Sequence, residues 1–141
     1  LPGPETQKLA ARALLIGEFL AREKPDLKLN PLPATAHVHG HCHQKSFGAF
    51  PDALALLGRV PNLDVRPITS SCCGMAGAFG YEAAHYDVSM KMAEMSLLPA
   101  VRAASTDTIL VADGTSCRHQ IHDGAGREAI HVARVLERAL P

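Results

Sequence analysis

The four cysteines are the residues of this chain whose type and spacing point most directly to chemistry. Cys72 and Cys73 are adjacent within the segment SSCCGMAGAFG, whereas Cys42 and Cys117 stand far from them in the sequence. A disulfide between the adjacent pair is unfavourable, because consecutive Cα atoms lie about 3.8 Å apart and disulfides usually span about 4.4–6.8 Å. Thiolates are soft ligands that suit iron–sulfur clusters, zinc and monovalent copper. We therefore expect the four sulfurs to hold a metal centre.

The spacing of the cysteines bears on which metal they would bind. The compact C-x₂-C pairs of zinc ribbons are absent, and adjacent thiolates bind different irons of one cluster more easily than one tetrahedral zinc. Gly74 and Gly77 leave backbone N–H groups free to approach an anionic cluster. An iron–sulfur cluster is the favoured prediction, and a zinc-stabilised structural or docking module is the alternative. A thiol redox enzyme that uses Cys72 and Cys73 is a third, less favoured hypothesis.

Histidines surround two of the cysteines. His41 and His43 flank Cys42 and are candidates to line the site, as is His119, two residues beyond Cys117. The segment HVHGHCH has a histidine at every second position, which places them on one face if the chain is extended. These histidines could serve as ligands, as proton carriers or as hydrogen-bond donors to the cluster. For the two earlier ones, His37 and His39, the favoured interpretation is that they are strand residues with satisfied hydrogen bonds.

Other polar residues follow the cysteine segments. Lys45, Arg118 and Gln120 are expected either to neutralise the charge of the centre, to meet a partner, or simply to be solvated. Asp113 is expected to cap the turn that follows it.

Hydrophobic periodicity predicts the elements that position these residues. Strands are expected over residues 35–39, 63–68 and 108–112. Helices are expected over residues 4–23, 50–60, 82–98 and 127–140, with a further helical turn after Pro99 and a loop over 113–117. The alternation of strands and helices predicts an α/β fold with a Rossmann-like parallel sheet of three to four strands and helices on both faces.

Each predicted strand is followed closely by cysteine. Because ligands of such sheets bind beyond the carboxyl ends of the strands, three loops are expected to deliver four sulfurs to one edge of the sheet. The helix expected from Glu82 would direct its positive end at the same place.

Composition limits the class of protein. With 141 residues, 47% of them hydrophobic and 20% charged, the chain is expected to form one globular domain over residues 1–141, in which residues 1–30 are a leading helix and linker. The zero net charge gives no indication of a nucleic-acid partner. Apolar runs fall short of the roughly 20 residues that span a membrane. A cytoplasmic chain without a transmembrane segment is expected, and its start at Leu1 indicates a piece of a longer protein.

Three segments of the chain resemble a known family. HGHCHQKSF, SCCGMAGAFGYE and ADGTSCRHQI are similar to the three segments of the cysteine-rich CCG domain, which occurs in heterodisulfide reductase and in the iron–sulfur subunit of glycolate oxidase. The similarity covers roughly residues 34–139 and is greatest to the C-terminal part of FAD-linked dehydrogenases of the lactate and glycolate type. It implies an electron-transfer domain with a [4Fe–4S] cluster ligated at Cys42, Cys72, Cys73 and Cys117, and FAD on another domain of the parent protein.

The sequence departs from the fullest family pattern at one position. That pattern ends C-x-x-C, and here the last position is Gln120. The resemblance therefore implies a single four-cysteine [4Fe–4S] cluster, or a site completed by His119, rather than a double cluster. The chain has no ferredoxin-type cysteine run and no G-x-G-x-x-G segment.

The chain is accordingly expected not to be catalytic alone. Its expected partners are a flavin dehydrogenase domain or subunit for 2-hydroxy acids and an electron acceptor. Attachment to the periphery of the inner membrane through the parent complex is compatible with the cytoplasmic expectation.

Overall fold

The computed structural model describes residues 3–141. Four parallel strands form one sheet in the order β2-β1-β3-β4. The strands are β1 (Ala34–His39), β2 (Leu63–Pro67), β3 (Ile109–Ala112) and β4 (Ala129–Ile130). At the centre of the sheet, Ala36 of β1 is in register with Val65 of β2 and Ile109 of β3. The predicted α/β fold with a parallel sheet is confirmed.

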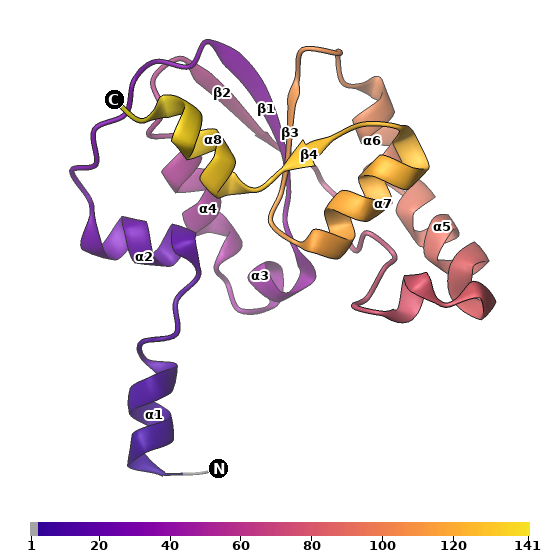
Figure 1. Ribbon diagram of the computed structural model, residues 1–141, viewed down its shortest axis with the longest axis horizontal. Helices are drawn as coiled ribbons and strands as arrows, with labels where there is room; N and C mark the ends of the chain where they lie inside the picture. Colours follow the sequence, from indigo (N-terminus) through magenta and orange to yellow (C-terminus); the bar gives the residue numbers. More distant parts are fainter. Residues whose placement is uncertain (1–2) are drawn as a thin grey trace.

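Helices cover both faces of the sheet, as predicted (Figure 1). One face carries α4 (Phe50–Leu57) and α8 (Val132–Ala139), and α2 (Ile16–Glu23) packs on α4. The other face carries α5 (Tyr86–Glu94), α6 (Leu97–Ala103) and α7 (Thr115–Ala125). The remaining elements are α1 (Pro4–Ala10), α3 (Cys42–Ser46) and two 3₁₀ turns, η1 (Phe79–Tyr81) and η2 (Ala83–His85).

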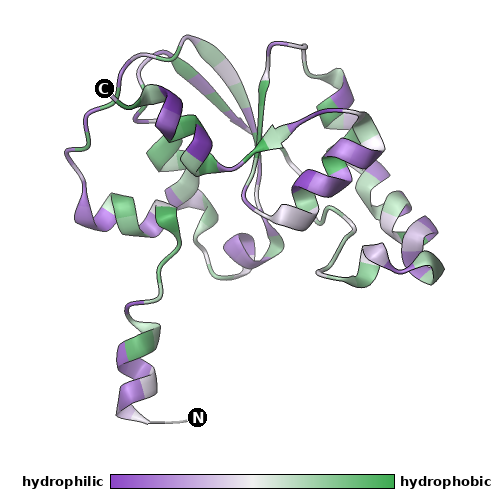
Figure 2. Ribbon diagram, viewed as in Figure 1, coloured by the Kyte–Doolittle hydropathy of each residue, from purple (hydrophilic) through white to green (hydrophobic). Residues whose placement is uncertain are grey.

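Each face of the sheet has its own apolar core. Leu56, Leu57 and Val135 pack under α4 and α8, while Leu97 and Ile121 pack under α6 and α7. Figure 2 shows β3, β4 and α4 as mainly hydrophobic segments, in agreement with burial from both sides of a parallel sheet.

The strand order creates a switch point between β1 and β3. The chain leaves β1 toward β2 on one side and returns from β2 to β3 on the other, so the two central strands have connections that diverge. In open α/β sheets, the crevice for ligands lies at the carboxyl ends of the strands at such a point. His39 ends β1 and Ala112 ends β3, immediately before the cysteine segments.

The single helix predicted over residues 4–23 is wrong, because the structure has two helices there. The carboxylate of Glu18 accepts a hydrogen bond from the backbone N–H of Leu15 at 2.8 Å and so caps the start of α2. Gly17 lies against the backbone of Ala53 in α4, which fixes α2 on the body of the protein. α1 has no buried residue and extends away from the body (Figure 1), so burial in a core does not hold it in line with α2.

Other boundaries also differ from the prediction. Residues 115–117, expected in a loop, begin α7, and α5 begins at Tyr86 after two 3₁₀ turns rather than near Glu82. The closing helix starts only at Val132, because residues 129–130 pair with β3 as a fourth strand. Every helix within residues 3–141 is too short or too polar to cross a membrane.

Candidate metal centre

All four cysteines are free thiols that lie at the carboxyl edge of the sheet. Cys42 is the first residue of α3, directly after β1, and Cys117 lies in the first turn of α7, directly after β3. Cys72 and Cys73 lie in the connection that follows β2. The expectation of three loops is therefore corrected, since only the adjacent pair lies in a loop.

The helix that begins at Cys42 has a local cause. The side-chain oxygen of Gln44 accepts a hydrogen bond from the backbone N–H of His41 at 3.0 Å, and His41 Nδ1 accepts one from the N–H of His43 at 3.3 Å. This reciprocal pattern is a capping box, with histidine in the place usually taken by serine or threonine. A glutamine three residues after a polar cap was the sequence signal for this helix.

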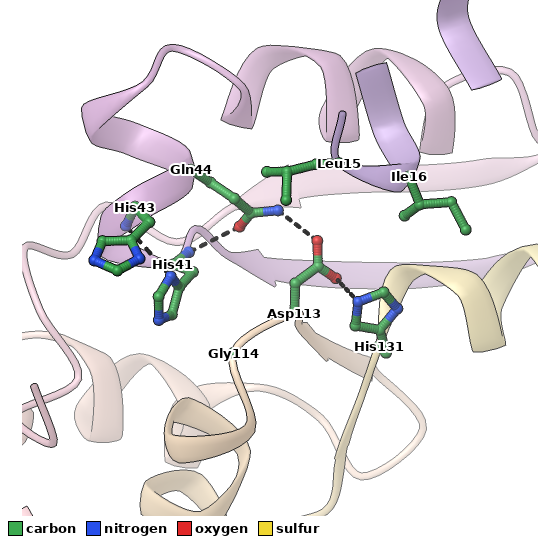
Figure 3. A pocket seen from close by; sticks show the side chains of 8 residues that line it. All are labelled: Leu15, Ile16, His41, His43, Gln44, Asp113, Gly114 and His131. Atoms are coloured by element: carbon green, nitrogen blue, oxygen red, sulfur yellow. Dashed lines mark hydrogen bonds and ion pairs between the residues drawn. The ribbon is translucent and has the colours of Figure 1, made fainter. Parts of the chain in front are cut away.

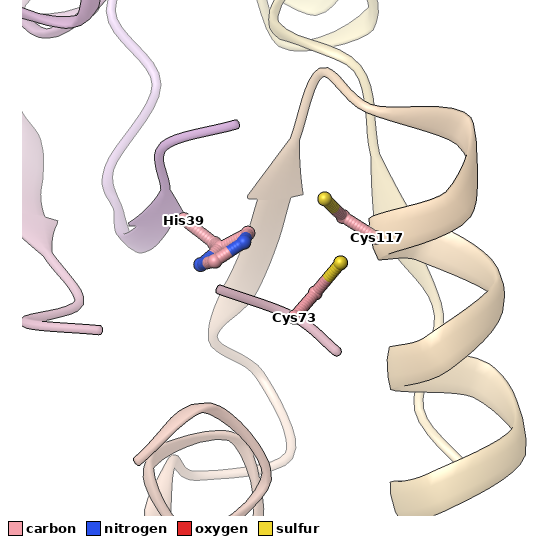
Figure 4. A group of neighbouring side chains, drawn as sticks. All are labelled: His39, Cys73 and Cys117. Carbon is pink, nitrogen blue, oxygen red and sulfur yellow. The ribbon is translucent and has the colours of Figure 1, made fainter. Parts of the chain in front are cut away.

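Two of the sulfurs are buried and two are partly exposed. Cys73 and Cys117 have exposed fractions of 2% and 0%, and their Sγ atoms and an imidazole nitrogen of His39 lie within 4.8 Å of one another (Figure 4). Cys42 is hydrogen-bonded to the side chain of Cys72, whose Sγ accepts a hydrogen bond from the N–H of Gly74 at 3.3 Å. The structure thus brings a buried pair and a partly exposed pair of thiols to one edge of the sheet.

The pKa values of the two buried thiols, Cys73 and Cys117, are shifted in opposite directions. Hydrogen-bond donation by the Cys117 thiol lowers the pKa of Cys73 to about 4, against the opposing effect of burial, and His39 and the backbone at Met75 act in the same direction as Cys117. The same hydrogen bond, together with burial, raises the pKa of the Cys117 thiol. Burial, followed by the hydrogen bond to Cys72, raises the pKa of Cys42. Without a metal, Cys73 is therefore the thiolate of the group.

The positive end of a helix does lie at the site, but it belongs to α7. Cys117 is within the first turn of α7, where the backbone N–H groups are not used by the helix itself. The helix that was expected to serve this role, α5, approaches with its middle instead. A methyl group on Gly74 would overlap the carbonyl oxygen of Ser89 in α5.

Gly74 and Gly77, two predicted site residues, shape the loop around the adjacent cysteines. Both have left-handed backbone, with φ of 92° and 69°. Only Gly74 is crowded, by Ser89 and by the amide of Gln120 at 3.1 Å from the position of a Cβ, whereas nothing lies within 4 Å of that position at Gly77. Gly77 instead lines the cavity beside Cys42 and Cys72.

The predicted histidines occupy different places. His41 and His43 line the cavity of about 410 Å³ beside Cys42 and Cys72. A Cβ on Gly114 would overlap the His41 ring and lie 2.9 Å from Cys117 Sγ, so His41 is close to the buried sulfurs. His119 is exposed and its Nδ1 is hydrogen-bonded to the Tyr81 hydroxyl at 2.5 Å.

Sequence reasoning favoured a structural role for His39 and left it out of the predicted site. It was interpreted as a strand residue with satisfied hydrogen bonds, yet Nε2 of this buried side chain has no hydrogen-bond partner among the described residues. The signal was present, because His39 is the last residue before the turn that leads to Cys42. At a switch point, the end of the central strand is where a side chain reaches the crevice.

A second cavity, of about 300 Å³, adjoins the first through His41 and His43 (Figure 3). Its polar wall is organised by Asp113, which was expected to cap the turn after it. Instead, Asp113 Oδ1 accepts a hydrogen bond from the N–H of Val132 at 2.9 Å and lies 3.5 Å from His131 Nε2. Asp113 therefore caps α8, and its other oxygen accepts a hydrogen bond from Gln44.

Lys45, Arg118 and Gln120, the polar residues that follow the cysteines, donate hydrogen bonds to backbone carbonyl oxygens and are not simply solvated. Lys45 Nζ donates to the carbonyl oxygens of Ser70 and Ser71, at 2.7 and 2.5 Å, and so ties α3 to the approach of the cysteine loop. Arg118 donates to the carbonyl oxygens at the end of β3. Gln120 is buried and donates to the backbone and hydroxyl of Ser89.

Comparison with known proteins finds similarity to parts of two dehydrogenases. The chain is 30% identical over 118 residues to one subunit of the anaerobic glycerol-3-phosphate dehydrogenase of Escherichia coli K12, covering 84% of the chain and 29% of that subunit. It is 29% identical over 129 residues to the D-2-hydroxyglutarate dehydrogenase of the same organism, covering 87% of the chain and 12% of that protein. The chain therefore spans less than a third of the length of either relative. No protein-family model and no solved structure matches it.

Proposed function

We propose that this chain is an iron–sulfur electron-transfer domain of a larger flavin-dependent dehydrogenase. The observation that carries the proposal is the convergence of Cys42, Cys72, Cys73 and Cys117, from three separate segments, on the switch point of a parallel sheet. The similarity to segments of two dehydrogenases supports the same assignment.

The residues present fit a [4Fe–4S] cluster. Four thiols supply one soft ligand for each iron, and such clusters are held by four cysteine thiolates. The partner-free Nε2 of His39 and the first turn of α7 offer N–H groups to an anionic group at the same place. Gln120, which stands where the fullest CCG pattern has a further cysteine, is bonded to Ser89, in agreement with a single cluster.

When bound, the cluster would accept and release one electron. The chain's own residues hold it in place and control access to it. Cys73 and Cys117 would bind it from the buried side, and Cys42 and Cys72 from the side of the 410 Å³ cavity, where His41 and His43 line the approach. An electron donor or acceptor would therefore come from the cavity side.

The parent enzyme is proposed to oxidise a 2-hydroxy acid of the lactate or glycolate type with FAD on another domain. D-2-hydroxyglutarate, named for one relative, is itself a 2-hydroxy acid. Residues 1–141 would then be one module of that enzyme, with residues 1–30 leading into it, and a cytoplasmic location with peripheral attachment to the inner membrane through the parent complex belongs to the same proposal.

A zinc-stabilised module is the second candidate. The observation that favours it is the group His39, Cys73 and Cys117, whose three potential ligand atoms lie within 4.8 Å of one another. Two thiolates and an imidazole are a known zinc-binding set. Zinc would be redox-silent, and its binding would appear mainly as folding stability.

Metal analysis separates these functions. We expect the chain, purified anaerobically without a nickel column and reconstituted with iron and sulfide, to bind about four irons and about four sulfides and to gain broad visible absorbance. Cys72→Ser and Cys73→Ser should each lose the cluster with helical circular dichroism retained, because the other apolar residues of the two cores stay in place. Ser71→Ala, next to the pair and exposed, is the matched control and should load fully.

Zinc at about one per chain, with no iron uptake on reconstitution, would contradict the proposal. If Cys72→Ser kept its full iron content, three cysteines would serve the site, and a histidine would be the fourth ligand.

A further inference from the structure

His39 is the most deeply buried titratable side chain outside the cysteine set. It ends β1, has an exposed fraction of 1%, and its Nδ1 lies 2.7 Å from the hydroxyl oxygen of Ser70. Its other ring nitrogen has no hydrogen-bond partner in residues 3–141. A buried polar atom without a partner is energetically unfavourable, and nearly all such atoms in folded proteins have one. This nitrogen therefore points to a group that binds there.

The ring lies beside the buried sulfurs. Figure 4 shows the imidazole, Cys73 and Cys117 converging from β1, the cysteine loop and α7. Their potential ligand atoms lie within 4.8 Å of one another, and His39 is close enough to Cys73 to lower the pKa of that thiol. A group placed between these side chains would contact all three.

The hydrogen bond to Ser70 sets which ring nitrogen carries the proton. If the Ser70 hydroxyl donates to Nδ1, the proton of the neutral ring is on Nε2, which then faces the sulfurs as a donor. The opposite tautomer would direct a nitrogen lone pair at electron-rich sulfur. Lys45 holds Ser70 in place through its carbonyl oxygen, so the position of the hydroxyl is itself fixed.

We propose that His39 is a positioning residue of the cysteine centre, whose Nε2–H donates a hydrogen bond to the cluster sulfur or thiolate at Cys73 and Cys117. The inference rests on the proposed function. Four cysteines already give each iron of a [4Fe–4S] cluster a ligand, so the ring acts as a donor and not as a fifth ligand.

The consequence is a higher reduction potential. Reduction adds negative charge to the cluster, and an N–H directed at its sulfur stabilises the reduced form more than the oxidised form. Because the donor is buried, water cannot replace it when it is removed. Loss of the donor should therefore make the cluster harder to reduce.

The test compares reduction potentials of reconstituted variants of the 141-residue chain. We expect His39→Leu to shift the one-electron midpoint downward by about tenfold in the reduction equilibrium, equivalent to about 59 mV. His39→Gln, which keeps an N–H donor, should shift it less, and Ser70→Ala, which frees the tautomer, should also lower it. His37→Leu is the matched control, because His37 lies on the same strand and lines a different cavity.

A second measurement starts from the wild-type protein. Pulsed EPR of wild-type protein labelled with ¹⁵N-histidine should show a weak nitrogen coupling from a hydrogen-bonded ring, and the coupling should be absent in His39→Gln. A strong coupling, as from a nitrogen bound directly to iron, would overturn the donor role. A wild-type spectrum without any histidine coupling, or midpoints of His39→Leu and His39→Gln equal to that of His37→Leu, would also overturn it.

The results that would overturn the donor role of His39 differ from those that would overturn the proposed function. If the wild-type chain binds no iron and sulfide, the proposed function itself is wrong. If it loads fully and only the His39 measurements fail, the electron-transfer proposal stands and the donor role is withdrawn.

Discussion

At the scale of single residues, Cys73 and Cys117 combine two properties that usually exclude each other. Both are buried among apolar neighbours of the second core, and both must lose a proton to bind a metal. Their mutual hydrogen bond means that only one of the two must still lose its proton. It lowers the pKa of Cys73 to about 4, so Cys73 is already a thiolate in the metal-free chain.

This pair gives the metal-free chain a specific pH dependence. The pKa of Cys73 is about 4 in the folded chain and has its ordinary value of 9.0 in the unfolded chain, so its stabilisation is complete above the unfolded value and is lost as pH falls toward 4. Between these values the unfolded chain binds more protons, and the free energy of unfolding rises with pH by at most about 1.4 kcal/mol per unit. The raised pKa of Cys117 acts in the opposite direction, and only above the unfolded value.

Urea denaturation under anaerobic, reducing conditions with a chelator checks this prediction. The wild-type free energy of unfolding should rise between about pH 5 and 8 relative to that of Cys73→Ala. Cys42→Ala is the control and should keep the wild-type slope in this window, since burial raises the pKa of Cys42. Equal slopes for the wild type and Cys73→Ala would show that Cys73 is not the thiolate.

At the scale of elements, the loop that carries the adjacent cysteines is held against α5. Ser89, in the middle of α5, is the contact for Gly74, and its hydroxyl and carbonyl oxygens accept hydrogen bonds from Gln120 of α7. The cysteine loop, α5 and α7 therefore meet at one point. The absence of a side chain at Gly74 is what permits this approach.

Gly74→Ala and Gly77→Ala form a matched pair for this loop. Both place alanine in left-handed backbone, which costs roughly 1–2 kcal/mol, but only at Gly74 does the new methyl overlap Ser89, which adds about 1–3 kcal/mol. We expect Gly74→Ala to be the less stable of the two in chemical denaturation and to load less iron. Equal free energies of unfolding for Gly74→Ala and Gly77→Ala would mean that α5 does not pack closely against this loop.

The elements also show what could be predicted from the sequence. The alternation of apolar strands and helices was sufficient for the parallel sheet, and the position of cysteines after strands was sufficient to place them at one edge. The start of α2 has a local signal in Glu18, three residues after Leu15, but the position of α2 on α4 depends on the contact of Gly17 with Ala53, far away in the sequence. The sequence placed His39 at the end of a strand next to the crevice, but not its individual neighbours, because Ser70, Cys73 and Cys117 come from other segments.

At the largest scale, the cysteine centre has a closed side and an open side. The far side of the cysteine centre is closed by the apolar core under α6 and α7, while its open side has the two cavities that share His41 and His43. An electron-transfer module needs this asymmetry, because the centre must be shielded from water and yet be reached by a partner. The chain corresponds to a minor part of its relatives, in agreement with a module that works beside others.

EPR spectroscopy of the reconstituted chain after one-electron reduction tests the central claim most directly. We expect a spectrum that integrates to about one unpaired spin per chain, disappears on reoxidation, and is absent from Cys73→Ser. A protein that stays colourless and EPR-silent, while zinc binds at its cysteines and raises its stability, would contradict an electron-transfer function.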